Sequence, residues 1–416
     1  MIKRIIATII IVSMVFSAGC WNIVELNEAA VAIGLGADVE DDDVLSFTAQ
    51  LAFPIDREAA GPGEETHIVV TEKGDTFTEA ARKIMLTVPR LPIWAHSSTF
   101  LIGENLAKKD LALIADFIGR NRNIRKNSAM FLTRDTTPAE VYEVETPLEM
   151  HSAVALMKMI QIQEEQLGIY IPVTISEFLA QLSTPGIEPV LPQVVVKEVD
   201  EEKHALDVED DDNDNNNENG EEEEEEEEEE IEKSLRLDGT GVFAGRKLVG
   251  SLNEIESRGL RFLQTRMING GLITLEDVAD INGRITLELI RSRAIIKPQI
   301  EGETITMDID IEGEFNFYEL SGSTKEILNR KYVGIIEEAT ARKVEQEVSM
   351  AINRAQELES DIFGFGREIS RVNPNSWKEL NENWNTKHFP EVETNIKVTM
   401  DLRRSYLQDK IFRFAN

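Results

Sequence analysis

The only cysteine, Cys20, is the residue whose chemistry follows most directly from its position. Lys3 and Arg4 precede a twelve-residue apolar stretch, 5–16, and the small residues 17–19 lead directly to the thiol. A charged start, a short apolar stretch and small residues are the layout of a secretory signal peptide. A lone thiol at its end resembles the bacterial lipoprotein signal, in which the sulfur receives a diacylglyceryl group and the new N-terminus an acyl chain. The sequence therefore predicts lipid attachment at Cys20, and acyl chains contribute about 0.8 kcal/mol per buried methylene to membrane binding.

Two alternatives stay open for this N-terminal segment. Ser17 and Gly19 also suit an ordinary signal peptidase, which would release a soluble secreted protein, and the apolar stretch could instead remain as an uncleaved anchor. Twelve apolar residues are fewer than the ~20 that a transmembrane helix needs. The absence of a second cysteine favours lipid attachment, because a secreted protein stabilised by disulfides needs an even number of cysteines.

The histidines show no spacing typical of a catalytic or metal site. No pair of the form His-x-x-x-His occurs, and no Gly-x-Ser-x-Gly nucleophile motif is present. The sequence therefore predicts a protein that is not an enzyme, without catalytic residues, cofactor or metal site. The five histidines are His67, His96, His151, His204 and His388.

One segment has the spacing of a calcium-binding loop. Asn215, Asn217 and Asn219 alternate before Gly220, and Glu226 stands at the twelfth place. The first ligand of such loops is normally aspartate, the glutamate is guaranteed by ten consecutive glutamates, and no amphipathic helices flank the segment. Weak, diffuse cation binding is therefore favoured over a specific site, and added calcium should then compact the segment.

Charge is distributed very unevenly along the 416 residues. The net charge is −34, and the segment from Asp200 to Glu232 contributes −20, with 21 acidic residues against Lys203. This charge balance leaves no basic patch of the kind that binds nucleic acid. An anionic membrane would repel a protein with this net charge. Repulsion between like charges and the lack of apolar residues predict a disordered acidic linker over 199–233.

The remaining sequence mixes strands and helices without a strict βαβ repeat, which predicts an α+β fold. The predicted division is a signal peptide over 1–19, an N-terminal α+β domain over 20–198 and a C-terminal α+β domain over 234–416. Period-two patterns and turn residues predict strands at 44–52, 67–71, 97–102, 129–132, 190–196, 284–290, 294–299, 304–312 and 395–403, with a hairpin over 241–250. Helical spacing and capping residues predict helices at 76–87, 106–118, from Pro138, at 151–166, and one long helix from Thr324 to about Ser360.

Four groups of motifs, in this order, resemble one protein family across nearly the whole mature chain. They are Cys20–Asn27 with Gly34–Asp38; His96–Glu104 with Asp116–Arg120 and Arg125; Gly241–Gly250 with Glu256–Gly259; and Asp361–Gly366 with Pro374, Trp377, Trp384 and Phe389. They resemble the C-subunit lipoproteins of spore germinant receptors, the Ger(x)C family. The chain departs from the family pattern at Asn22, where aspartate is frequent, at Ser17, where leucine is usual, and in its longer acidic tract.

The resemblance implies a lipid-anchored, non-enzymatic receptor component with several α+β domains. Its implied partners are two membrane-embedded receptor subunits, and its implied location is the extracytoplasmic face of the spore inner membrane. Whether this component touches the small-molecule germinant stays open. The alternative is a lipid-anchored solute-binding protein, which usually has α/β halves with repeated βα units around a cleft.

The tryptophans, an arginine cluster and one glycine-rich turn are further candidates for partner contacts. Trp21 would sit beside the lipid, where an amphipathic ring suits the headgroup zone. Each other candidate has a structural alternative: core packing for the tryptophans, a solvated helix end for the arginines and a tight turn for the glycines. These candidates are Trp94, Trp377 and Trp384; Arg120, Arg122 and Arg125; and Asp361–Gly366.

Overall fold

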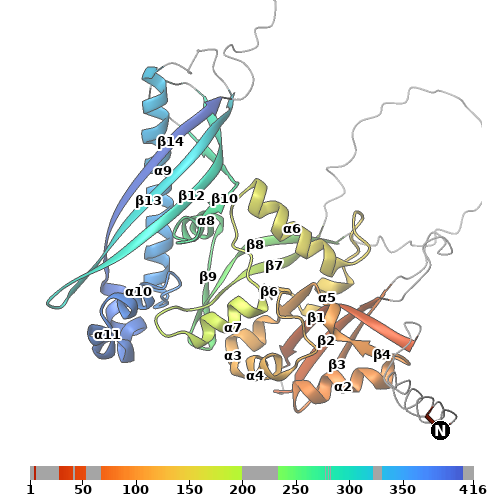
Figure 1. Cartoon of the computed structure of the whole chain (residues 1–416). Helices are drawn as coiled ribbons and strands as arrows, with labels where there is room; N and C mark the ends of the chain where they lie inside the picture. Colours follow the sequence, from red (N-terminus) through yellow and green to blue (C-terminus); the bar gives the residue numbers. More distant parts are fainter. Residues whose placement is uncertain are drawn as a thin grey trace, which may run out of the picture.

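The computed structural model of the chain contains two β-sheets with packed helices (Figure 1). It describes residues 4–5, 28–40, 43–52, 67–198, 233–276, 278–279, 281, 283–321 and 330–405. Cys20, Trp21, most of the predicted signal peptide, the calcium-like spacing and residues 199–232 of the predicted linker lie outside the described residues. Mixed sheets and a long C-terminal helix confirm the predicted α+β class.

The first sheet has nine strands in the order β3-β2-β1-β5-β6-β7-β8-β9, and β4 pairs with β1. The central strands β1, β5, β6 and β7 run parallel, whereas β2, β3, β8 and β9 extend the sheet in antiparallel fashion. The strands are β1 (Ala29–Val39), β2 (Leu45–Ala52), β3 (His67–Gly74), β4 (Leu91–Ile93), β5 (Thr99–Ile102), β6 (Ala129–Thr133), β7 (Val190–Glu198), β8 (Lys233–Ala244) and β9 (Lys247–Leu252).

Helices cover both faces of this sheet, so its central strands are buried on both sides. On β5, Phe100 and Ile102 join the core beneath α2, α3, α4 and α7, whereas Leu101 between them joins the core beneath α5 and α6. The helices are α2 (Phe77–Thr87), α3 (Glu104–Lys109), α4 (Ala112–Arg120), α5 (Pro138–Glu143), α6 (Ser152–Gln166) and α7 (Ile175–Ser183).

Local capping explains where two of these helices begin. Thr76 accepts a hydrogen bond from the amide of Glu79 at the start of α2. Thr137 and Glu140 form a reciprocal capping box, with a proline as the first residue of α5. The start of α5 lies at the predicted position, and α2 begins one residue after the predicted start at 76.

The predicted helix over 106–118 is wrong, because α3 and α4 are separate helices. Asp110 between them has extended backbone angles, φ −169° and ψ 114°. Its Oδ1 accepts a hydrogen bond from the amide of Ala112 at 2.8 Å. The amide of Leu111 donates to the carbonyl of Arg246 in the β8–β9 turn at 2.9 Å. An aspartate side chain that bonds its local backbone competes with continuation of a helix.

The second sheet has five strands in the order β10-β12-β13-β14, and β11 pairs with β12. The long helix α9 (Arg330–Glu357) packs against this sheet and against α8. The other elements are β10 (Ile268–Asn269), β11 (Leu272–Leu275), β12 (Arg284–Glu301), β13 (Thr304–Ser321), β14 (Glu393–Ser405), α8 (Glu254–Phe262), α10 (Phe365–Val372), α11 (Pro374–Leu380) and short helical turns over 381–391. Among the described helices, none is long and apolar enough to cross a membrane.

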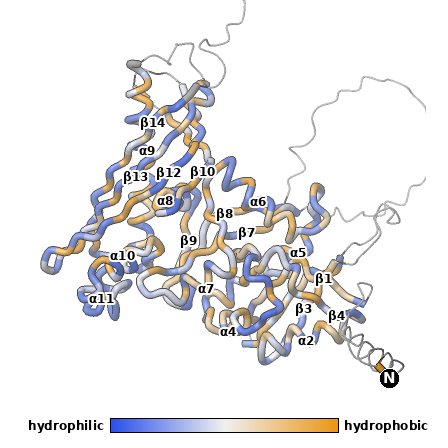
Figure 2. The backbone as a smooth tube through the Cα atoms, viewed as in Figure 1, coloured by the Kyte–Doolittle hydropathy of each residue, from blue (hydrophilic) through white to orange (hydrophobic). Residues whose placement is uncertain are grey.

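The two strands predicted at 284–290 and 294–299 form the single strand β12. Its register with β13 shifts between Thr286 and Leu287 and again between Leu289 and Arg291, so a bulge lies at Ile290 and the polar residues 291–293 after it pair with β13. Inward and outward residues otherwise alternate along β12 and β13, as the alternating hydrophobic and hydrophilic bands in Figure 2 show.

The first sheet contains strands from both sides of residues 199–232. β8 pairs antiparallel with β7 from Val190↔Val242 to Glu198↔Lys233, and β9 pairs with β8. The predicted hairpin is present, but it completes the sheet of the N-terminal half, since the edge of β7 would otherwise be unpaired. The strands of the first sheet therefore extend to Leu252, the last residue of β9. The next helix, α8, packs against α9.

Candidate functional site at the carboxyl ends of the parallel strands

The carboxyl ends of the parallel strands are the first place to look for a site, because ligands of open α/β sheets bind there. β1, β5 and β6 end at Val39, Ile102 and Thr133. Two motif segments that are distant in sequence, Gly34–Asp38 and His96–Glu104, meet at this edge through the parallel pairing of β1 with β5.

Asp38 is a buried carboxylate that fixes the start of α3. Its Oδ1 accepts hydrogen bonds from the amides of Leu106, at 3.0 Å, and Val39, at 2.8 Å. Burial raises the pKa of Asp38, and these backbone bonds oppose the rise. A Cβ atom at Gly103 would lie 1.9 Å from the carboxyl carbon of Asp38, so this position has no space for a side chain.

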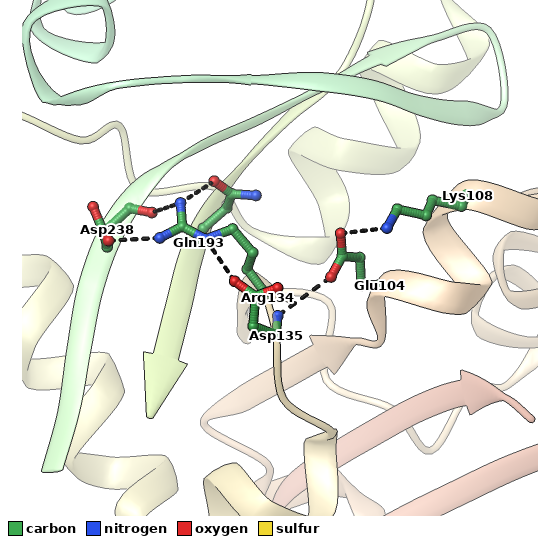
Figure 3. Close-up of polar contacts among 6 residues, drawn as sticks. All are labelled: Glu104, Lys108, Arg134, Asp135, Gln193 and Asp238. Atoms are coloured by element: carbon green, nitrogen blue, oxygen red, sulfur yellow. Dashed lines mark hydrogen bonds and ion pairs between the residues drawn. The ribbon is translucent and has the colours of Figure 1, made fainter. Parts of the chain in front are cut away.

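Arg134, directly after β6, links three strands of the sheet (Figure 3). Its guanidinium donates to the carbonyl of Asp238 at 2.8 Å, to Oδ2 of Asp238 at 2.5 Å and to Oε1 of Gln193 at 3.3 Å. Asp238 lies on β8 and Gln193 on β7. Gly239 beside them has a φ of +94°, and a Cβ there would lie 2.7 Å from Oε1 of Gln193.

Glu104, at the start of α3, extends the same network toward the first parallel strands. Its carboxylate pairs with Lys108 at 2.6 Å and accepts a hydrogen bond from the amide of Asp135 at 3.3 Å. Burial acts to raise the pKa of Glu104, but these hydrogen bonds and the charges of Lys108 and Arg134 outweigh it, so the pKa is lower than usual.

Figure 3 shows the six polar residues around Arg134 as one connected set of contacts. All five ionised side chains in this set are paired with an opposite charge, and the set spans α3, the end of β6, β7 and β8. Such a network positions elements relative to one another. Within the described residues it presents no nucleophile next to a base, so its chemistry fits a structural role.

The Asp361–Gly366 motif is a second buried site, at the end of α9. Oδ1 of Asp361 accepts from the amides of Gly364, at 2.8 Å, and Phe365, at 3.0 Å. Oδ2 accepts from the amide of Gly366 at 2.7 Å and from the indole Nε1 of Trp384 at 2.8 Å. Burial raises the pKa of Asp361 and the four hydrogen bonds oppose that rise. The carboxylate organises the tight turn that starts α10.

Two of the tryptophans that were candidate interface anchors belong to the core. Trp377 and Trp384 are both buried and meet edge to face, with ring centroids 5.5 Å apart. Trp384 also packs against Phe389. A Cβ at Gly366 would lie 2.6 Å from the Trp377 ring, which explains the second glycine of the motif. For Trp377 and Trp384 the structure therefore shows core packing, the alternative to a partner contact.

The same turn joins the second sheet to the first. Glu188, before β7, donates its amide to the carbonyl of Asp361 at 2.8 Å. Its carboxylate accepts from the amide of Gly245 at 2.6 Å and from Nδ2 of Asn385 at 2.5 Å. Two further bonds connect these segments, from Ser360 Oγ to the Phe243 carbonyl at 2.5 Å and from the Arg367 amide to the Gly186 carbonyl at 2.8 Å.

A groove of about 890 Å³ lies between α2, β4 and α4. Trp94 lines it and packs edge to face on Phe47, with centroids 5.7 Å apart. Arg120 also lines it and forms an exposed ion pair with Asp116 at 2.7 Å. Trp94 and Arg120 of the arginine cluster, separate in the sequence, are therefore brought together at one groove, whereas Arg122 and Arg125 are not among the residues that line it.

Two histidines whose spacing in the sequence gave no signal are in contact in the fold. The rings of His67 and His151 meet edge to face with centroids 5.2 Å apart, across β3 and the start of α6. Burial, and then the neighbouring His67, lower the pKa of His151. In the part of the chain that the structure describes, no group of three or more His, Cys, Asp or Glu residues is placed to hold a metal.

The chain matches models of known families in both halves. Residues 22–196 match the model described as "Spore germination protein N-terminal domain", and residues 238–406 match "Spore germination B3/ GerAC like, C-terminal". Together the two matches cover most of the chain, one on each side of the acidic tract.

Curated relatives and one solved structure agree with these matches. Spore germination protein KC of Bacillus subtilis (strain 168) is 22% identical over 98% of this chain and 97% of its own. Spore germination protein B3 of the same organism is 21% identical over 92% of this chain and 93% of its own. The crystal structure of the GerBC protein has a similar fold, with a TM-score of 0.54, 18% identity and coverage of 92% of this chain and 99% of that chain.

Proposed function

The chain belongs to the Ger(x)C family of spore germination proteins, and we therefore propose that it is a lipid-anchored, non-enzymatic component of a nutrient germinant receptor. The observation that carries the proposal is the match of both halves, in order, to family models, with relatives aligned along almost the whole chain. In this proposal the protein acts in germination together with two membrane-embedded subunits.

The proposed anchor is a lipid on Cys20 after removal of residues 1–19. Ala29, the first residue of β1, follows Cys20 by only nine positions, so a lipid there would hold the folded body close to the bilayer. Tethering raises the local concentration of a protein relative to membrane partners and so favours their assembly. The polar network at Arg134 and the buried network at Asp361 support a scaffolding role, because they fix the elements of each sheet and join the two sheets.

The solute-binding alternative expects two similar halves with repeated βα units around a cleft. The two sheets differ instead in strand number, order and direction, and hydrogen bonds around Glu188 connect them directly. No specific observation favours that alternative.

A deletion strain tests the proposed function. Spores without the protein should lose the response to one class of nutrient while still germinating with a trigger that bypasses receptors. An unchanged response to every nutrient, in a strain from which paralogous receptors have also been removed, would contradict a receptor role.

A pair of variants tests the anchor. Cys20→Ala removes the lipid acceptor and should release the protein from spore membranes when they are washed at high salt, and it should weaken the nutrient response. Ser17→Leu restores the residue that is usual in lipoprotein signals and should leave both unchanged. Retention of the Cys20→Ala protein on membranes washed at high salt, which weakens electrostatic contacts, would argue against lipid as the sole anchor.

A further inference from the structure

The groove between α2, β4 and α4 lies at the end of the molecule away from the second sheet (Figure 1). Its rim is next to the start of β1, since Ala29–Val31 of β1 pairs in parallel with Leu91–Ile93 of β4. Glu28 follows Cys20 by eight positions, which span at most roughly 28 Å when the chain is extended. A chain anchored at Cys20 therefore keeps this groove near the bilayer.

The sign of the charge reverses around this groove. Residues 75–95 and 111–127, which form it, contain seven basic and three acidic residues, a net charge of +4 in a chain of −34. Arg82, Arg122 and Arg125 have no ion-pair partner among the residues that the structure describes, and all three are exposed. Basic side chains near an anionic surface are attracted to it individually, so a basic face can dock although the whole chain is acidic. The basic residues are Arg82, Lys83, Arg90, Arg120, Arg122, Arg125 and Lys126.

Large apolar side chains are exposed on the same face. Leu86, at the end of α2, is 84% exposed, and Met85, Leu91 and Leu113 are also exposed beside the groove. Apolar side chains ringed by basic residues are the composition of surfaces that lie in the membrane interface, where the apolar part enters the boundary between headgroups and acyl chains.

From these observations we propose that the face formed by α2, β4 and α4 docks on the bilayer and binds the phosphates of anionic phospholipids. The short tether places the face, the basic residues supply charge complementarity, and Leu86 is the side chain that enters the interface most deeply. The tether argument rests on the lipid anchor of the proposed function, whereas the charge and apolar arguments do not.

The first experiment measures vesicle binding without the lipid anchor. Residues 20–416 with Cys20→Ala contain every described strand and helix from Glu28 onward. This protein is mixed with phosphatidylcholine vesicles, with or without phosphatidylglycerol, and the bound fraction is measured by flotation. Binding should require phosphatidylglycerol and weaken as salt is raised.

Charge-reversal variants locate the contact. Arg82→Glu with Arg122→Glu should weaken binding to the phosphatidylglycerol vesicles about 30-fold or more, because each basic residue near an anionic surface contributes roughly fivefold. Arg342→Glu with Lys378→Glu makes the same change in net charge on α9 and α11 and should leave binding nearly unchanged. Equal loss in both double variants, or no preference for phosphatidylglycerol, would overturn the proposal.

A label at position 86 tests the same face independently of charge. With Cys20→Ala the chain has no other cysteine, so Leu86→Cys or Leu148→Cys carries a single environment-sensitive dye. Leu148, 94% exposed in the α5–α6 connection, lies beyond the opposite face of the first sheet and is the control. Phosphatidylglycerol vesicles should shift the emission at 86 to shorter wavelength and not at 148.

The remaining outcomes of the label experiment are also decisive. Shifts at both positions, or at neither, would overturn the proposal. A shift at 86 only in vesicles that also contain the membrane-embedded receptor subunits would assign the face to a protein partner instead. Since neither experiment uses a lipid anchor or germination, their failure is separate from failure of the proposed function.

Discussion

Replacing Asp361 with asparagine should strongly destabilise the joint between α9 and α10. The carboxylate accepts four hydrogen bonds, two on each oxygen, inside a site that excludes water. An asparagine amide has one acceptor oxygen, so its NH₂ group must face either Gly364 and Phe365 or Gly366 and Trp384, all of which are donors.

The magnitude follows from the bonds lost. Two hydrogen bonds to a charged acceptor contribute about 1.5–3 kcal/mol each, which gives about 3–6 kcal/mol. Removing a buried charge offsets part of this loss, so the expected decrease in the free energy of unfolding is about 3 kcal/mol. Domains are typically stable by only about 5–15 kcal/mol, so such a decrease is large.

Chemical denaturation, followed by tryptophan fluorescence, measures this decrease as a shift of the unfolding midpoint. Trp384→Phe removes one of the four bonds and keeps an aromatic ring, whereas Trp377→Phe changes the neighbouring buried ring without touching Asp361. The Trp384 variant should therefore be less stable than the Trp377 variant by about 1.5–3 kcal/mol. A change below about 1 kcal/mol for Asp361→Asn would refute the role assigned to the carboxylate.

Two further predictions concern the first sheet. Gly103→Ala places a methyl group against the Asp38 carboxylate and should lower the free energy of unfolding by about 2–3 kcal/mol. Gly119→Ala, at a position where a Cβ meets no atom within 4 Å, should raise the free energy of unfolding by about 0.5–1 kcal/mol. Equal melting temperatures of the two variants would contradict this prediction. Because burial and His67 lower the pKa of His151 in the folded state, the unfolded state binds its proton more readily. Stability should therefore decrease as pH falls below about 6.5, and His151→Gln should flatten that part of the pH profile of unfolding.

Elements with strong local signals were predictable from the sequence. Alternation over 44–52 predicted β2, and the Thr137–Pro138 pair predicted the start of α5 because capping acts within one turn. The predicted helix from Thr324 to about Ser360 corresponds to α9 over Arg330–Glu357, and the earlier part of that prediction lies outside the described residues.

Elements that depend on distant contacts were not predictable. Asp110 ends α3 partly because the next amide bonds to Arg246, which is 136 positions away. The polar residues after Ile290 resemble a turn in the sequence, and only their pairing with β13 shows that the strand continues past the bulge at Ile290. The start of α10 depends on the four bonds of Asp361, whose most distant donor is 23 residues along the chain.

The candidate sites divide in the same way. The sequence identified the Asp361 motif, the arginine cluster and Trp94 as segments of interest, but only the fold shows that Trp94 and Arg120 line one groove. The His67–His151 contact carries no sequence signal, because two residues 84 positions apart become neighbours through β3 and α6. Lipid attachment at Cys20 stays a prediction.

The pairing of β7 with β8 has a consequence for how the protein is made. During synthesis, the ribosome must produce residues 199–232 before β8 is available, so β7 has an unpaired edge for that interval. The next segment to be synthesised carries most of the negative charge of the chain, and nascent chains that bear it repel one another. We therefore expect the position of the acidic tract to reduce edge-to-edge association of growing chains while the first sheet is incomplete.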